Sequence, residues 1–336
     1  MTRRKSRAVL AAVVVAVVVA VIALVAVRAL DEEPTVSSPQ DSGTSGQDSG
    51  TSGGDSDTSD APASAEADAS APDAYPDADN TGVPPGTELA PYEGPCTITE
   101  TVVLSTVDAT GVCPAIVVQA AGVRIEASRV PRVESTATQV DPTFSVEVVD
   151  SEVVAGEWIG GAVWGDNLTV RRTEITGGAY SVHCGSGCLV EDSWLHEQFN
   201  PDGEAAHNNA FLSNGGSHMV IRHNTLHCTP TLNDTDGGCT ADLSLFGDFG
   251  PIRDVVVEDN LLKANASSVS YCAYLGHAPG KAYPVATGVV VTGNVFERGT
   301  NDLCGVYGPV TSYQVDAEGN VWRDNTWDDG TKLVPE

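Results

Sequence analysis

Basic residues are scarce in this chain of 336 residues, which holds 17 Lys and Arg against 46 Asp and Glu, for a formal net charge of −29. Affinity for phosphate depends on clusters of Lys and Arg that release counterions, so this composition excludes a nucleic-acid-binding protein. The chain also lacks Cys-x-x-Cys pairs and an Asp-rich calcium triplet. We therefore expect no cofactor and no metal site.

The charge is spread unevenly along the chain. Residues 1–30 carry a charge of +5, residues 31–90 carry −14, and residues 91–336 carry −20. Such shifts in composition mark boundaries between parts that follow different structural rules. We treat these three parts separately.

The first part contains a run of twenty Ala, Val, Leu and Ile residues, Ala8 to Val27, without one polar side chain. At about 1.5 Å per residue, a helix of this length spans the hydrocarbon core of about 30 Å. Basic residues precede the run and acidic residues follow it, which orients the N-terminus toward the cytoplasm. We predict a cytoplasmic stub at residues 1–7, a transmembrane signal-anchor helix at residues 8–28 in the cell membrane, and an extracellular body. A cleaved signal peptide is the alternative, although its apolar region is normally shorter.

Residues 29–90 are rich in Asp, Ser, Gly, Thr and Pro and contain almost no bulky apolar side chains. Such a segment buries too little surface to offset the entropy of ordering it, so we predict a disordered linker. A linker of this type has a root-mean-square reach of roughly 40 Å, enough to hold a domain away from a membrane.

One short phrase recurs in the third part. Six clear copies and one weaker copy begin at Val146, Leu168, Cys188, Met219, Val255, Val289 and Gly319. Aligned on a shared Ser, Thr or Asn, the copies follow one another after 22, 20, 31, 36, 34 and 26 residues. This spacing indicates stacked units that cannot bury their apolar face alone. The phrase is rich in Val and Ile and has no helical periodicity, so each unit is predicted to be a coil of β-strands.

The shared polar position is Asn in the last four copies, at Asn224, Asn260, Asn294 and Asn320. Asn tolerates left-handed backbone and hydrogen-bonds locally, which suits a tight turn. Stacked Asn side chains can also hydrogen-bond to one another along the solenoid as a ladder.

The Val-x-Ile-x-x-Asn-x-Leu phrase resembles the right-handed parallel β-helix, or pectin-lyase-like, superfamily over residues 115–328. The resemblance implies an all-β solenoid domain at residues 91–336 and, with the predicted anchor, a bacterial membrane-anchored surface protein. A β-sandwich would lack one repeated phrase, and a propeller blade needs about 40 residues.

Longer spacings between copies require insertions, which fall at residues 196–208, 229–240 and 277–286. We expect all three to leave corresponding corners of successive coils and to form the wall of a groove for a long ligand.

Eight cysteines in an extracellular body predict four disulfide bonds. Proximity in the sequence suggests Cys96–Cys113, Cys184–Cys188, Cys228–Cys239 and Cys272–Cys304, one of 105 possible pairing schemes.

Related β-helix proteins often carry a His-x-Asp-Gly-x-Gln phrase at the coil that begins here with His207. The position of its Asp is occupied by Asn209, which cannot exchange a proton near neutral pH but can hydrogen-bond a sugar hydroxyl. Six histidines gather between residues 183 and 227. Because His223 shares its repeat position with Arg172 and Asp192, we interpret that position as a solvated turn rather than a zinc ligand.

Glycoside hydrolysis needs two carboxylates about 5–10 Å apart. Asp242 and Asp248 flank the strand at residues 243–246 and, with His207, are the candidate catalytic residues. The candidate ligand-binding residues are His183, Asn209, Trp164, Tyr274 and Tyr307. Of the aromatic side chains at residues 164, 246, 274 and 307, we expect two at the groove and the others in the core.

The sequence favours a protein that binds a polysaccharide or cell-wall glycan in the groove without cleaving it, and that acts as a monomer. A surface adhesin or spacer is a variant of this hypothesis. A glycoside hydrolase or polysaccharide lyase using the same groove is the alternative. The charge of −20 on the body makes a polyanionic ligand unfavourable and a neutral glycan favourable.

Overall fold

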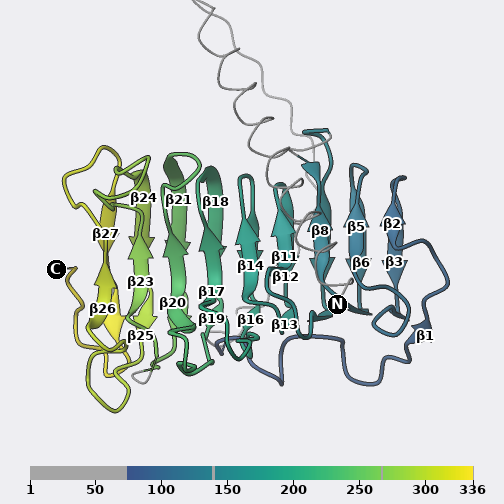
Figure 1. Cartoon of the computed structure of the whole chain (residues 1–336), viewed down its shortest axis with the longest axis horizontal. Helices are drawn as coiled ribbons and strands as arrows, with labels where there is room; N and C mark the ends of the chain where they lie inside the picture. The colour runs from purple at the N-terminus through teal and green to yellow at the C-terminus, as the bar shows by residue number, and fades with distance from the viewer. Residues whose placement is uncertain (1–73, 138–140, 266–267, 336) are drawn as a thin grey trace, which may run out of the picture. The chain divides into compact units, whose positions relative to one another are not determined.

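A computed structural model describes residues 74–137, 141–265 and 268–335. These residues belong to one compact unit. The unit consists of short strands that stack into three parallel sheets, so the chain is a parallel β-helix solenoid (Figure 1).

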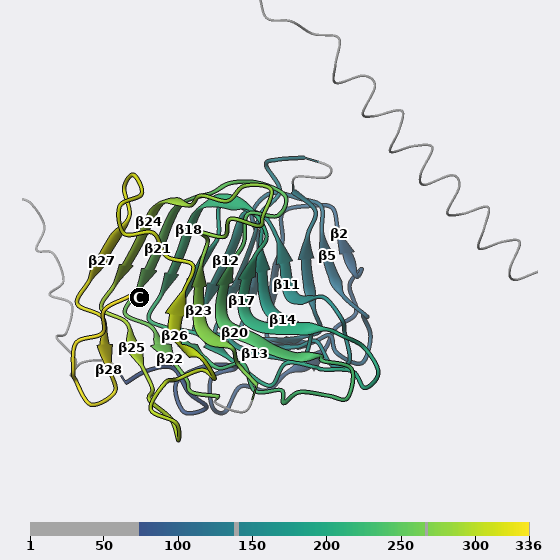
Figure 2. The same ribbon diagram turned by 60° about the vertical axis from the view of Figure 1, so that its left-hand side comes forward.

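Each coil contributes one strand to each sheet, and the chain runs through sheets B, C and A in turn (Figure 2). Sheet A contains, in spatial order, β1 (Ala90–Pro91), β4 (Val107–Asp108), β7 (Arg129–Val130), β10 (Glu152–Val154), β13 (Glu174–Thr176), β16 (Trp194–Leu195), β19 (Thr225–Leu226), β22 (Leu261–Leu262), β25 (Val295–Phe296) and β28 (Thr326–Trp327). Sheet B contains β2 (Thr97–Ile98), β5 (Ile116–Val118), β8 (Val133–Ser135), β11 (Gly161–Gly165), β14 (Tyr180–Cys184), β17 (His207–Ser213), β20 (Gly238–Leu245), β23 (Tyr271–Leu275) and β26 (Gly308–Thr311). Sheet C contains β3 (Val103–Ser105), β6 (Val123–Glu126), β9 (Val146–Val149), β12 (Leu168–Arg171), β15 (Leu189–Glu191), β18 (Gly216–Arg222), β21 (Ile252–Glu258), β24 (Thr287–Thr292) and β27 (Val321–Arg323).

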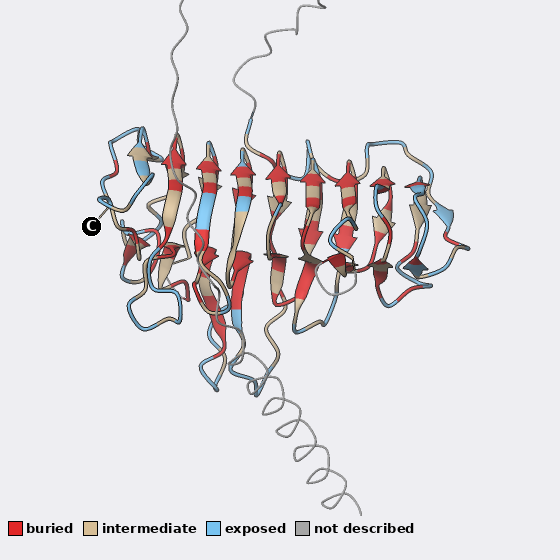
Figure 3. Cartoon of the chain, turned by 90° about the horizontal axis from the view of Figure 1, so that it is seen from above, coloured by how far each residue is buried: buried red, intermediate tan, exposed pale blue. Residues whose placement is uncertain are grey.

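The apolar residues of the repeated phrase form the core. On sheet C, equivalent positions of successive strands are occupied by Val148, Val170, Val190, Ile221, Val257 and Val291, and each is at most 2% exposed. β-branched side chains fit this site because they pack against the same residue type one coil above and below. Figure 3 shows buried and intermediate segments alternating along the strands of the solenoid.

The predicted polar ladder is confirmed. Within the Asn part of the column, Nδ2 of Asn224 donates to Oδ1 of Asn260 at 2.9 Å, and Asn260 donates in the same way to Asn294 at 2.9 Å. The next member is Asn325, at 2.8 Å, rather than the predicted Asn320. The ladder residue of the seventh copy therefore lies five residues after the predicted Asn320. The prediction was wrong because Gly319-Asn320 is the same dipeptide as Gly293-Asn294.

The residue before each ladder position lies in the left-handed region of backbone conformation. The φ angles of the non-glycine residues there lie between 44° and 56°, at Asp150, Arg172, Asp192, His223, Asp259 and Asp324. This conformation turns the chain from sheet C to sheet A while the next side chain points inward. The repeat position accepts Asp, Arg and His because it is a turn, as the sequence predicts.

The folded body begins earlier than the composition suggests. Residues 74–90, assigned above to the linker, lie against the solenoid: the ring of Tyr75 stacks on His223 with centroids 5.7 Å apart, and the Gly82 N–H donates to the Arg172 carbonyl at 3.1 Å. Strand β1 then pairs with β4. The predicted anchor at residues 8–28 and most of the linker lie outside the described residues, and no helix in the described part is long and apolar enough to cross a membrane.

All four predicted disulfides are present. They join Cys96 to Cys113, Cys184 to Cys188, Cys228 to Cys239 and Cys272 to Cys304. The third bond closes the insertion before β20, and the fourth joins β23 to the segment that precedes β26.

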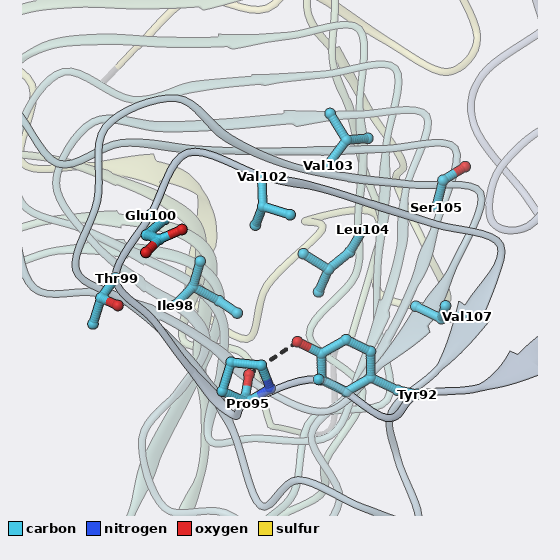
Figure 4. Close-up of a pocket in the computed structure, with 11 residues that line it drawn as sticks. Tyr92, Pro95, Ile98, Thr99, Glu100, Val102, Val103, Leu104, Ser105 and Val107 are labelled. Carbon is cyan, nitrogen blue, oxygen red and sulfur yellow. Dashed lines mark hydrogen bonds between the residues drawn. The ribbon is translucent and has the colours of Figure 1, made fainter.

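The two ends of the solenoid differ. At the C-terminal end the chain folds back after β28, where Trp322 Nε1 donates to the Leu333 carbonyl at 3.0 Å and Leu333 is buried. At the N-terminal end the first coil surrounds a hollow of about 540 Å³, lined by Tyr92, Ile98, Leu104 and neighbouring residues (Figure 4).

Candidate functional site

The outer face of sheet B carries a continuous column of side chains, one from each coil. Strand register places Trp164 beside His183, His183 beside Leu212, Leu212 beside Ser244, and Ser244 beside Tyr274. Neighbouring coils are about 4.8 Å apart, so this column extends for about 19 Å along the solenoid.

Loops border this column on both sides. Residues 196–206 and 227–237 connect sheet A to sheet B at one edge of sheet B, as predicted for a common corner. The third insertion, residues 276–286, connects sheet B to sheet C and so lies at the opposite edge. The expectation of a single common corner is corrected accordingly, and the consequence is a floor with a wall on each side.

A cavity of about 360 Å³ lies over β14, β17, β20 and β23 between these walls. It is lined by Tyr180, His207, Asn209, Leu212, Asn214, Thr240, Phe246, Asp248, Tyr274 and Lys281. The lining combines aromatic rings with amide and hydroxyl groups, the combination that accommodates a molecule with apolar faces and polar edges.

Asp248 is held firmly at the floor of the cavity. Lys281 Nζ lies 2.7 Å from its Oδ1, and Asn214 Nδ2 donates to its Oδ2 at 2.8 Å. Burial by itself would raise the pKa of Asp248, yet the hydrogen bonds from Lys281 and Asn214 lower that pKa below its ordinary value. The ammonium of Lys281 also lies 4.7 Å from the ring centroid of Phe246. Asp248 is therefore ionised, and each of its two carboxylate oxygens has a polar partner.

His183 lies next to the cavity, in edge contact with Tyr180 at 5.4 Å and tilted toward Trp164 at 6.5 Å between ring centroids. Burial lowers the pKa of His183, and a hydrogen bond with Asn214 opposes this shift only in part. The imidazole is therefore neutral at pH 7.

His207 and Asn209, for which the sequence predicts a place near a ligand, both line the cavity. His207 is exposed, whereas Asn209 is buried and its Oδ1 accepts a hydrogen bond from Ser244 Oγ at 2.5 Å. The Asn209 amide also donates to the His207 carbonyl at 3.2 Å. Asn209 thus joins β17 to β20 beneath the cavity.

Asp242 does not lie in the groove, contrary to the sequence expectation. It is 0% exposed, and its Oδ1 accepts the backbone N–H of Cys228 at 2.7 Å, while its Oδ2 has no hydrogen-bond partner among the described residues. Burial raises its pKa well above the ordinary value. The segments that carry Cys228 and Cys304 cover this carboxyl group, so no ligand in the groove reaches it.

A carboxylate oxygen of Asp242 and the sulfur atoms of Cys272 and Cys304 lie within 4.8 Å of one another. The two sulfur atoms are bonded in a disulfide, so neither is the thiolate that a metal ion requires. His196 pairs with Glu174 at 3.1 Å, and His223 pairs with Asp192 at 2.7 Å on a different turn.

The four aromatic candidates all avoid the core, although two of them were expected there. Phe246 and Tyr274 line the cavity, with ring centroids 5.3 Å apart. Trp164 is half-buried on the column, and Tyr307 is 67% exposed and contacts Tyr271 rather than the cavity.

Sequence reasoning missed Tyr180 and Asn214. Asn214 follows β17 by one residue and Asp248 follows β20 by three residues, so both lie where the chain leaves sheet B, and this placement is the signal that would have found Asn214. No family model, no curated protein and no solved structure matches this chain.

Proposed function

We propose that the groove over sheet B binds a neutral or weakly charged glycan, such as a cell-wall polysaccharide, without cleaving it. The observation that carries this proposal is the walled cavity that Tyr180, Phe246 and Tyr274 line together with amide and hydroxyl groups. Aromatic faces stack on the apolar faces of sugar rings, and amides hydrogen-bond the hydroxyls around them. The column from Trp164 to Tyr274 extends the site along the solenoid, which suits a polymer.

Charge within the cavity supports a neutral ligand. Lys281 lines the cavity, and its charge is compensated by Asp248, whose Oδ1 lies 2.7 Å from Lys281 Nζ. His183 is uncharged at neutral pH because burial lowers its pKa. A polyuronate would meet no unpaired cation among these groups and would be repelled by the acidic body.

The arrangement of carboxyl groups favours binding over hydrolysis. Glycoside hydrolysis requires an acid and a second carboxylate on opposite sides of the scissile bond. Asp248 is the acidic residue among the cavity-lining side chains, and it is held as an ion pair. Asp242 is buried elsewhere, and Asn209 stands where related proteins carry an acid.

Our proposal also includes the finer assignments made from the sequence. In it, the solenoid is right-handed and pectin-lyase-like, residues 8–28 anchor the chain in the membrane, and the body lies outside the cell. The four disulfides support an oxidising compartment.

The test uses the full-length chain in detergent and a panel of neutral and acidic polysaccharides immobilised in affinity gels. We expect retardation by a neutral polysaccharide and no new products in solution. New reducing ends would show a hydrolase, and ultraviolet-absorbing unsaturated ends would show a lyase. Absence of retardation by every polysaccharide would overturn the proposal.

A further inference from the structure

A buried acid lies beside one of the four disulfide bonds. A carboxylate oxygen of Asp242 and the sulfur atoms of Cys272 and Cys304 lie within 4.8 Å of one another, and all three residues are 0% exposed. Asp242 lies on β20 and Cys272 on the neighbouring strand β23, each immediately before the first residue that pairs between the two strands. The register of sheet B therefore places the acid next to the disulfide, outside the lining of the groove cavity.

The contacts of the Asp242 carboxyl group do not explain why an acid occupies this place. Its Oδ1 accepts the backbone N–H of Cys228 at 2.7 Å, whereas its Oδ2 has no hydrogen-bond partner among the residues that the structure describes. A buried polar atom without a partner is unfavourable. The amide of an asparagine would accept the same backbone hydrogen bond without the cost of burying an acid. The acid therefore has a use that an amide does not supply.

The surroundings of the two sulfur atoms disfavour a thiolate. Cys272 Sγ lies 3.7 Å from the carbonyl oxygen of Lys263, and Cys304 Sγ lies 4.0 Å from the same oxygen. Carbonyl oxygens carry partial negative charge, and burial in apolar surroundings raises the pKa of a thiol. Disulfide formation nevertheless requires a thiolate, because the thiolate is the nucleophile. A thiol at this place needs a base close to it.

We propose that Asp242 is the internal base that takes the proton of the Cys272 thiol when the Cys272–Cys304 disulfide forms. Before this step Cys304 is held in a mixed disulfide with a small external thiol. The proton of the Cys272 thiol passes to the carboxylate of Asp242, and the resulting thiolate attacks the sulfur of Cys304. The new S–S bond forms, the bond to the external thiol breaks, and that thiol leaves as its thiolate. One negative charge is present before and after, and the mixed disulfide is the oxidant.

The electrostatics of the site suit this transfer. Burial raises the pKa of Asp242 well above its ordinary value, toward the ordinary thiol pKa of about 8.5. The charged side chains that act on Asp242 are Glu297 and Lys263, which oppose each other and are paired at 2.8 Å between Nζ and Oε1. After the transfer the carboxyl group is neutral, which is the form that burial favours.

The test follows closure of each disulfide in the full-length chain, reduced in denaturant and refolded in detergent with oxidised glutathione. Samples are quenched with an alkylating reagent at intervals, and each bond is quantified by mass spectrometry of the digested chain. Asp242→Asn keeps an acceptor for the Cys228 N–H but takes up no proton. We expect this variant to close Cys272–Cys304 roughly a hundredfold more slowly at pH 7. The difference should shrink toward pH 9, where the thiol ionises without a base.

Two controls separate proton transfer from a structural role. The Cys184–Cys188 bond lies on another coil and should close at the same rate in wild type and variant. Asp254→Asn makes the same change at an acid whose side chain is 59% exposed, and it should leave every closure rate at the wild-type value. If Asp242→Asn slowed Cys228–Cys239 and Cys272–Cys304 by the same factor at every pH, the acid would only support the local fold, and the proposal would be overturned.

Reduction of the folded, oxidised chain makes the test independent of refolding. In this direction the thiolate of dithiothreitol opens the bond, and the protonated Asp242 donates its proton to the departing thiolate of Cys272. We expect Asp242→Asn to slow reduction of Cys272–Cys304 at pH 7 but not that of Cys184–Cys188. Equal rates for Cys272–Cys304 in wild type and variant, in both directions, would contradict the proposal. None of these rates depends on whether the groove binds a glycan.

Discussion

The corner between sheets C and A and the outer face of sheet B use the same residue type, Asn, for opposite purposes. At the corner, Asn224, Asn260 and Asn294 are 0% exposed and bond to one another from coil to coil. In the groove, Asn214 is half-buried and its Nδ2 donates to Oδ2 of Asp248 at 2.8 Å. The difference teaches that repetition serves stability, because identical neighbours satisfy one another. Variation from coil to coil serves recognition, because each coil then offers a ligand a different group.

The largest expected effect comes from breaking the ladder. Asn260→Ala removes the amide that donates to the Ile221 carbonyl and to Asn294 and that accepts the Asn224 N–H. We expect the free energy of unfolding to fall by about 3 kcal/mol, because buried partners lose their hydrogen bonds. Chemical denaturation measures this loss. Glycan affinity of the folded variant should equal that of the wild type, and a loss below about 1 kcal/mol would contradict the stabilising role.

Asp242 tests whether a buried acidic residue of sheet B affects stability or ligand recognition. Burial raises its native pKa, so the native state binds a proton that the unfolded state releases, and stability falls as pH rises from the unfolded pKa toward the native one. The slope from this single group reaches about 1.4 kcal/mol per pH unit.

Asp242→Asn should flatten that part of the stability profile, measured as the denaturation midpoint against pH. It should leave glycan affinity unchanged. A loss of glycan affinity without a change in the pH dependence of stability would show that Asp242 contacts the ligand in the groove.

Tyr274 tests the groove face itself. Tyr274→Ala removes an aromatic surface that lines the cavity beside Phe246, and we expect affinity for a neutral glycan to fall about tenfold. Tyr307→Ala is the matched control, since Tyr307 is 67% exposed and lies outside the cavity lining. Equal effects of the two changes on affinity would show that the ligand does not occupy this cavity.

The smallest effect is expected on the outer face of sheet C. Arg222 pairs there with Glu191, which also pairs with Arg171 at 2.9 Å. Because the Arg222 side chain is 48% exposed, Arg222→Ala should cost less than about 1 kcal/mol of stability and should leave glycan affinity unchanged. Titration with glycan and thermal unfolding check both parts, and a change in affinity would point to a second binding face.

The sequence predicts the regular part of the molecule well. Val148, Val170 and Val190 recur at fixed places because each packs on its own equivalent, so a repeated residue reports a repeated environment. The cysteine pairing could be predicted from proximity in the sequence because residues that are close in sequence lie on the same coil or on neighbouring coils. Asn320 was misplaced in the ladder because a second Gly-Asn pair precedes the true turn.

The irregular part was predicted less well. Asp242 lies within β20 and Asp248 follows it, and only the path of the segments carrying Cys228 and Cys304 decides that the first is covered and the second open. The register shift between Asn208 and Asn209 also breaks the simple alternation by which a strand assigns its faces. Loop paths of this kind leave no periodic signal in a single sequence.

The most direct test of the account is the affinity of the full-length chain for neutral oligosaccharides of increasing length, measured by calorimetry on wild type and Tyr274→Ala. The account predicts that affinity rises with length until the ligand spans the column from Trp164 to Tyr274, about 19 Å, and that Tyr274→Ala removes the gain from the longer ligands. Affinity that is independent of length, or that is unchanged in Tyr274→Ala, would contradict a glycan-binding groove on sheet B.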